Sequence, residues 1–143
     1  MTTTFRADVA DGLLGVLNTF ATAHPTLLVR AYRARPASFP DLPAAYIADR
    51  SETITHTQGV RTRTLGGLSF VVVDRITDNA ETMQRFDTLV DTLLDAITAS
   101  PQLGTTGIWS GLSITDEDAP FGDYDFKGVR FAFPDISIME GRT

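Results

Sequence analysis

A buried strand followed directly by an amphipathic helix is the feature that most constrains the fold of this chain. Residues 65–97 contain the apolar run 70–73 and then, after a short polar turn, apolar side chains at helical spacing. The first part predicts a strand over 68–76 that is buried on both faces, and the second predicts a helix ending near residue 99. No catalytic side chain stands at the junction, where an α/β enzyme often places one, and this favours a protein that works by assembly. The predicted buried stripe of the helix is Met83, Phe86, Val90, Leu93, Leu94 and Ile97.

The other elements predict an α+β fold. An apolar stripe predicts a helix over 5–23, which ends at His24 because the residue before a proline avoids the helical region. Strands clustered between helices predict an antiparallel or mixed sheet with two helices packed on one face, in a single domain spanning 1–143. The opposite face of the sheet then needs a cover or a partner, which is a first reason to expect an oligomer. The predicted strands, besides 68–76, are 27–34, 44–48, 52–57, 108–115 and 126–133, the last with an extension through 136–138.

Composition narrows the class of protein. A hydrophobic fraction of 43% and a charged fraction of 21% are typical of a soluble globular protein. The N-terminus lacks the basic-then-apolar order of a secretory signal, so we expect synthesis in the cytoplasm, with no membrane partner. The absence of cysteine excludes disulfides, thiolate metal sites and cysteine nucleophiles. The net charge of −6 argues against tight DNA binding, which needs a concentrated basic patch.

Side chains that could carry chemistry are few. The two histidines, His24 and His56, fall in different predicted elements, so a metal site or a Ser-His-Asp arrangement would need further partners brought in by the fold. No phosphate-binding or nucleophile-elbow motif occurs. Gly66-Gly67 has no helix after it to cradle a phosphate, and it predicts a bulge or a flexible entry to the strand. We therefore predict no enzyme activity, and no catalytic, cofactor-binding or metal-binding residues.

Residues 116–125 form an acidic stretch with five carboxylates and no basic residue. The sequence predicts a loop here. Three interpretations remain open: a solvated loop, a site for a hard divalent cation such as calcium, or a contact with a basic partner.

Gln58-Gly59 predicts a hairpin turn, followed by a polar segment that alternates arginine and threonine. This segment is either an exposed loop or a projecting arm that pairs with a neighbouring subunit, because strand addition supplies main-chain hydrogen bonds with little demand on sequence. The residues of this candidate interface arm are Val60, Arg61, Thr62, Arg63 and Thr64.

Asp87, Asp91 and Asp95 recur every four residues in the second predicted helix and therefore share one face. The ordinary interpretation is a solvated polar face. The functional one is a negative wall lining the lumen of a ring through which DNA slides, because like charges would repel the phosphates.

Taken along its whole length, the chain resembles the tail terminator, or tail completion, proteins of long-tailed bacteriophages. The resemblance rests on the helix F-R-A-D-V-A-D-G-L-L-G-V-L, the extended segment P-D-L-P-A-A-Y-I-A-D, the hairpin and strand T-H-T-Q-G-V-R-T-R-T-L-G-G-L-S-F-V-V-V-D-R-I, the acidic helix after it and the closing pair of strands. The family has no invariant catalytic motif, so no functional residue is carried over.

The resemblance implies a virion protein, made in the host cytoplasm, that forms a homo-oligomeric ring, a hexamer, at the head–tail junction. Its expected partners are the major tail-tube protein and the head-completion or connector proteins, and DNA passes through without specific binding. Alternatives are a head-closure, connector or minor tail protein of the same neck. An alternative of another class is a small α+β enzyme or ligand-binding domain with a deep polar pocket.

Overall fold

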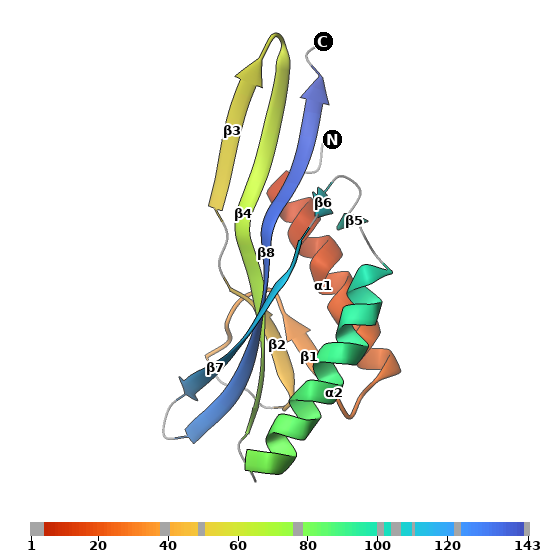
Figure 1. The fold of residues 1–143 in the computed structure, drawn as a ribbon, viewed down its shortest axis with the longest axis vertical. Coiled ribbons are helices and arrows are strands. Elements are labelled where there is room, and N and C mark those ends of the chain that lie inside the picture. Colours follow the sequence, from red (N-terminus) through yellow and green to blue (C-terminus); the bar gives the residue numbers. More distant parts are fainter. Residues whose placement is uncertain are drawn as a thin grey trace.

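The computed structural model describes residues 5–37, 41–48, 51–75, 79–99, 102–103, 107–109, 111–121 and 124–141. These residues form two helices and eight strands, arranged in an elongated molecule (Figure 1). The elements are α1 (Phe5–Ala23), β1 (Arg30–Tyr32), β2 (Ala44–Ile47), β3 (Ser51–Thr57), β4 (Val60–Arg75), α2 (Asn79–Thr98), β5 (Gln102–Leu103), β6 (Gly107–Trp109), β7 (Ser113–Phe121) and β8 (Tyr124–Gly141).

All eight strands belong to one sheet, in which the long strands β4 and β8 are the central pair. The order is β1-β2-β4-β8-β6-β5, with β3 also paired to β4 and β7 also paired to β8. The β1–β2 ladder is parallel and the other ladders are antiparallel. The predicted α+β class with a mixed sheet is therefore confirmed.

The two halves of the chain repeat the same order of elements, although the sequence contains no visible repeat. Each half consists of a helix, a short strand, a strand in two pieces and a long strand. In the first half the long strand is β4, and its hairpin with β3 points up in Figure 1. In the second half it is β8, and its hairpin with β7 points down in the same view. The antiparallel β4–β8 ladder joins the halves.

The strands beside β4 and β8 are interrupted at the same level of the sheet. The pairing register is the same on both sides of this break. Ile47 pairs with Phe70 and Ser51 pairs with Gly66, so β2 and β3 act as one strand with an interruption. On the other side, β6 and β7 are continuous in the same way along β8. Gly67 of β4 and Pro134 of β8 oppose each other at this level, and both are left out of the ladder.

Side chains change face across this break. Leu65 and Leu68 are both fully buried in the main core, although residues three apart in a regular strand point to opposite faces. In β8, Phe133 and Ile136 are likewise three residues apart and both buried in the main core. Gly67, with a φ of 66°, provides the backbone turn on β4 that resets the alternation. The two strands keep their pairing on both sides, so the predicted bulge at Gly66-Gly67 is wrong: neither strand gains an extra residue.

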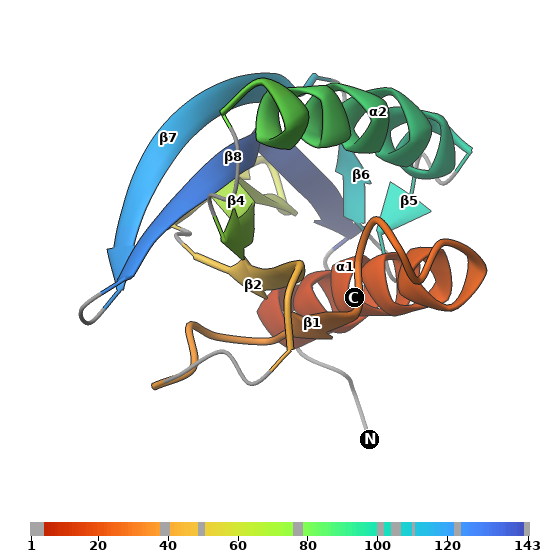
Figure 2. The same cartoon turned by 90° about the horizontal axis from the view of Figure 1, so that it is seen from below.

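The main core lies between the helices and one face of the sheet. It combines residues of α1 and α2 with alternate residues of the central strands, including Phe70, Val72, Val129 and Phe131. The sheet is curved, and α1 contacts both β1 at one edge and β5 at the other, so it lies across the opening of the curve (Figure 2). Phe70 and Phe131 stack at the centre, with ring centroids 4.7 Å apart.

Part of the opposite sheet face is already covered by the chain itself. Val71 and Val73 are buried there together with Tyr46, and Tyr32 and Leu42 pack against them. Of the two expected alternatives, a cover or a partner, the chain itself therefore supplies a cover in the region of β2 and β4.

Several predicted boundaries differ from the structure. The strand expected over 27–34 is limited to β1, and the strand expected over 108–115 is divided between β6 and β7. The acidic loop expected over 116–125 is mostly strand, because β7 and β8 pair as a long hairpin up to Phe121 and Tyr124. The side chains of residues 117–126 lie outside the described part, so the cation-site interpretation stays a prediction.

Helix α2 also turns a slightly different face to the core than its sequence predicts. Met83 is 36% exposed, whereas Leu89, which was not expected in the stripe, is buried. Phe86, Leu93 and Ile97 are buried as predicted.

Candidate interaction surfaces

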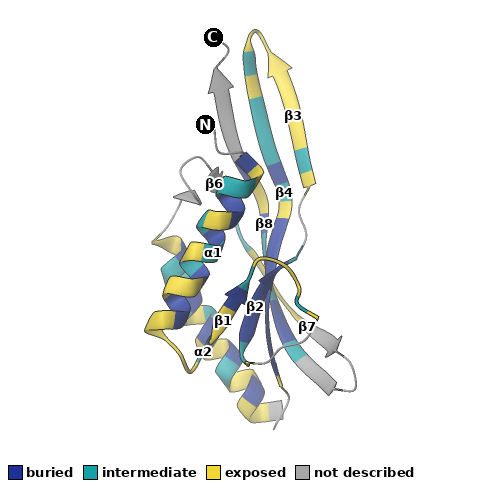
Figure 3. Ribbon diagram, turned by 180° about the vertical axis from the view of Figure 1, so that it is seen from behind, coloured by how far each residue is buried: buried dark blue, intermediate teal, exposed yellow. Residues whose placement is uncertain are grey.

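The candidate arm residues 60–64 lie in a three-stranded projection beyond the break in the sheet, which we call the arm. It consists of β3, the outer half of β4 and the outer part of β8 (Figures 1 and 3). Its hairpin turns at Gln58 and Gly59, with φ of 47° and 83°, as the primed two-residue turns of β-hairpins require. Within the described residues no strand pairs with the outer edge of β3. Val60, Thr62, Arg63 and Thr64 are half-buried in this arm and Arg61 is exposed.

The two faces of the arm have different chemistry. One face carries threonines from both strands, with Thr53 opposite Thr64 and Thr55 opposite Thr62. The other carries Glu52, Ile54 and His56 of β3, with Arg63 opposite Ile54 and Arg61 opposite His56. We call these the threonine face and the mixed face. Ile54 is 49% exposed, so a large aliphatic side chain of the mixed face is in contact with solvent.

The base of the arm is fixed to the body through Arg63. Its Nε donates to a carboxylate oxygen of Glu52 over 2.8 Å, and the two side chains are only 18% and 14% exposed. The guanidinium also lies over the ring of Phe5, 5.3 Å from its centroid, at the start of α1. The mixed face is therefore held against α1 at its base and is open further out.

The acidic residues Asp87, Asp91 and Asp95 of α2 are all exposed, as expected for one helix face. The structure adds a neighbour that the sequence did not predict. Asp87, Val90 and Asp91 line an open groove together with Ile114 and Asp116 of β7. This α2–β7 groove contains three carboxylates around two aliphatic side chains, and Ile114 is 39% exposed.

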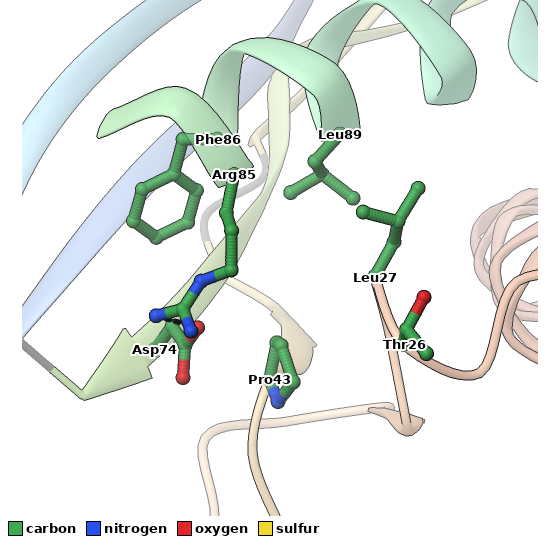
Figure 4. A pocket seen from close by; sticks show the side chains of 7 residues that line it. All are labelled: Thr26, Leu27, Pro43, Asp74, Arg85, Phe86 and Leu89. Carbon is green, nitrogen blue, oxygen red and sulfur yellow. Dashed lines mark ion pairs between the residues drawn. The ribbon is translucent and has the colours of Figure 1, made fainter. Parts of the chain in front are cut away.

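An ion pair between a partly exposed arginine and a largely buried aspartate ties α2 to the end of β4 that precedes the helix. Arg85 of α2 reaches Asp74 over 2.9 Å, beside a cavity of about 10 Å³ that is also lined by Pro43, Phe86 and Leu89 (Figure 4). Asp74 also accepts a hydrogen bond from the backbone N–H of Arg75. Burial raises the pKa of Asp74, and the Arg75 amide and the Arg85 guanidinium lower it, without cancelling the effect of burial. The arrangement positions α2 and leaves room for about one water.

The two histidines lie far apart. His24 follows the end of α1 and packs on Phe20, with ring centroids 4.8 Å apart, whereas His56 lies exposed on the arm. Phe5, at the other end of α1, contacts Arg63 of the arm. Within the described residues, no three His, Cys, Asp or Glu side chains are placed to hold a metal ion.

No family model matches the chain, and a search of curated proteins finds no match. In the part of the chain that the structure describes, neither helix is long and apolar enough to span a membrane.

Proposed function

We propose that this protein is a structural virion subunit that assembles into a ring, caps the tail tube of a long-tailed phage and joins it to the head or connector proteins. The observation that carries the proposal is the arm. It projects beyond the body, it has an outer β3 edge that no described strand covers, and it exposes Ile54. A long exposed edge strand is a template for pairing with another chain, and natural proteins usually block it. An arm of this kind gains burial when a neighbouring subunit covers it.

The acidic face of α2 is the second supporting feature. In a ring, Asp87, Asp91 and Asp95 would face either the lumen, where they would repel DNA phosphates, or the neighbouring subunit. In both places the residues act through their charge and need no catalytic partner.

Assembly is the first consequence to test. Mass photometry and light scattering of the purified chain over a range of concentrations are expected to reveal a ring-sized species, and negative-stain electron microscopy is expected to show closed rings. A chain that stays monomeric up to high concentration contradicts the proposal.

The place in the virion is tested by making phage without this protein. Overlong or headless tails are expected if the protein stops tube growth and joins the head. Tails of normal length that fail only to retain DNA-filled heads would instead identify a head-closure protein of the same neck. A gene position just before the major tail-tube gene would agree with tail termination.

A further inference from the structure

The mixed face of the arm offers an unusual combination of exposed groups. Ile54 is 49% exposed, and His56 and Arg61 lie beside it as an exposed cross-strand pair. On β3 and β4, the outer part of this face therefore presents the aliphatic side chain of Ile54 next to an imidazole and a guanidinium group.

The α2–β7 groove has the opposite character. Val90 and Ile114 provide aliphatic surface, and Asp87, Asp91 and Asp116 surround it with carboxylates. Ile114 and Asp116 project from the sheet on the same side as their cross-strand partners Phe131 and Val129, which face the core below α2. The groove therefore has a helix on one side and a strand of the central sheet on the other.

These two surfaces cannot meet within one chain. Ile54 pairs with Arg63, and Arg63 pairs with Ile138 of β8. Ile114 pairs with Phe131 of β8. The two levels, at Ile138 and Phe131, are seven residues apart along β8, which corresponds to roughly 23 Å at about 3.3 Å per residue. The surfaces lie on opposite sides of the break in the sheet, with the arm at the top of Figure 1 and β7 near the bottom.

We propose that the mixed face of the arm of one copy docks in the α2–β7 groove of a second copy. Ile54 would pack against Ile114 and Val90, and the basic groups of the arm would lie among the three carboxylates. Because the two surfaces are different, the contact is heterologous, and repeated contacts close into a ring when the rotation allows it. The inference rests on the self-assembly of the proposed function, and it assigns Asp87 and Asp91 to the boundary between subunits.

A charge-exchange experiment tests this contact. Arg61→Glu and Asp91→Arg each place like charges in the interface, so each variant alone is expected to assemble at least about ten-fold more weakly than the wild type. In an equimolar mixture every arm can meet an oppositely charged groove on the other variant, so assembly is expected to return, in rings with an even number of subunits. Mass photometry of the two variants, separately and mixed, measures both effects. Recovery on mixing also demonstrates that each variant is folded.

A matched pair on β3 tests which face of the arm is used. Ile54→Glu alters the mixed face and Thr55→Glu alters the threonine face at the next residue, and both positions are exposed. We expect Ile54→Glu to weaken assembly at least about ten-fold and Thr55→Glu to leave it within about two-fold.

The outcomes separate this inference from the proposed function. If the wild type never assembles, both are overturned. If the wild type forms rings and Asp91→Arg assembles as well as the wild type, or if the mixture does not recover, the docking contact is overturned and the ring remains. Equal losses from Ile54→Glu and Thr55→Glu would point to pairing through the β3 edge and would also overturn docking through the mixed face.

Discussion

The two halves of strand β4 show how one continuous strand can serve two purposes. From Leu68 to Val73 every residue is buried, between the helix-side core and the smaller cluster on the other face. From Val60 to Thr64 the residues are exposed or half-buried, and polar side chains predominate. The hydrogen-bonded ladder to β8 is the same in both halves, so the difference lies in the side chains and in what covers them. The inner half stabilises the fold, and the outer half presents a surface.

The largest expected effect on stability comes from a large-to-small substitution beside the inner half of β4, compared with one beside its outer half. Phe131→Ala removes a fully buried ring that stacks on Phe70, and we expect it to lower the free energy of unfolding by about 3–5 kcal/mol. Ile54→Ala on the arm is expected to change it by less than about 0.5 kcal/mol. Urea denaturation at concentrations where the chain is monomeric measures both. Similar losses from the two variants would mean that the arm is part of the cooperative core.

The ion pair at the inner end of β4 gives the next largest effect. Arg85→Met leaves the carboxylate of Asp74 in a half-buried site without its cation, and we expect a loss of about 2 kcal/mol at pH 7. Burial already raises the pKa of Asp74, and removal of Arg85 raises it further.

The pH dependence of that variant has a defined sign. A carboxyl with a raised pKa in the folded protein binds its proton more readily when folded, so lowering the pH through that pKa towards the unfolded value of about 3.9 favours the folded state. The deficit of Arg85→Met relative to the wild type should therefore shrink as the pH falls. The double variant Asp74→Asn with Arg85→Met has no carboxyl at position 74. Acidification should therefore not reduce its stability deficit through that residue. A deficit of Arg85→Met that grows on acidification would contradict the assignment.

The boundary between the two halves of β4 is tested at its adjacent glycines. Gly67 has a φ of 66°, and a Cβ added there would meet nothing within 4 Å, so Gly67→Ala is expected to cost about 1–2 kcal/mol through backbone strain alone. At Gly66 an added Cβ would meet the Pro134 carbonyl oxygen and the Ser51 hydroxyl at 3.6 Å, which is an ordinary contact, so Gly66→Ala is the matched control. Thermal unfolding of the two variants compares them. Equal stabilities would mean that the break does not depend on the conformation of Gly67.

The smallest expected effect is the release of the arm from α1. Arg63→Met removes the ion pair with Glu52 and the contact with the Phe5 ring, together worth about 1 kcal/mol. Hydrogen exchange of β3 amides should become about five-fold faster, while exchange in the Leu68–Val73 part of β4 stays unchanged. Arg33→Met is the control, because its pair with Asp11 is exposed on both sides and contributes little. An equal rise throughout β4 would show that the arm does not open on its own.

The sequence predicted α1, α2 and the central strand well because their apolar periodicity is strong. It missed that the polar segment and the apolar run form one strand. Leu65 and Leu68 are three residues apart, which breaks the alternation of a regular strand, and only the positive φ of Gly67 reconciles them. The β7–β8 hairpin was missed because acidic residues are uncommon in strands. The β7 segment is a strand because it pairs with β8, and no local sequence pattern predicts that pairing.

For the candidate surfaces, local sequence was informative only where a surface comes from a single segment. The arm and the acidic helix face could be predicted, since each depends on neighbouring residues. The α2–β7 groove could not, because Ile114 and Asp116 reach α2 only through the curvature of the sheet. The same holds for the pair of Asp74 and Arg85, which join the end of a strand to a helix across a turn.

The central β4–β8 ladder also has a consequence for the order of folding. The hairpins β3–β4 and β7–β8 each close through a short connection, so they can form early from local sequence. The ladder between them pairs Arg75 with Phe126 at one end and Val60 with Gly141 at the other, so its contacts join distant parts of the chain. Closing such long loops is slow, and folding should be limited by the meeting of two preformed hairpins. On a ribosome the first half would therefore wait, with the inner face of β4 uncovered, until the last strand has been synthesised.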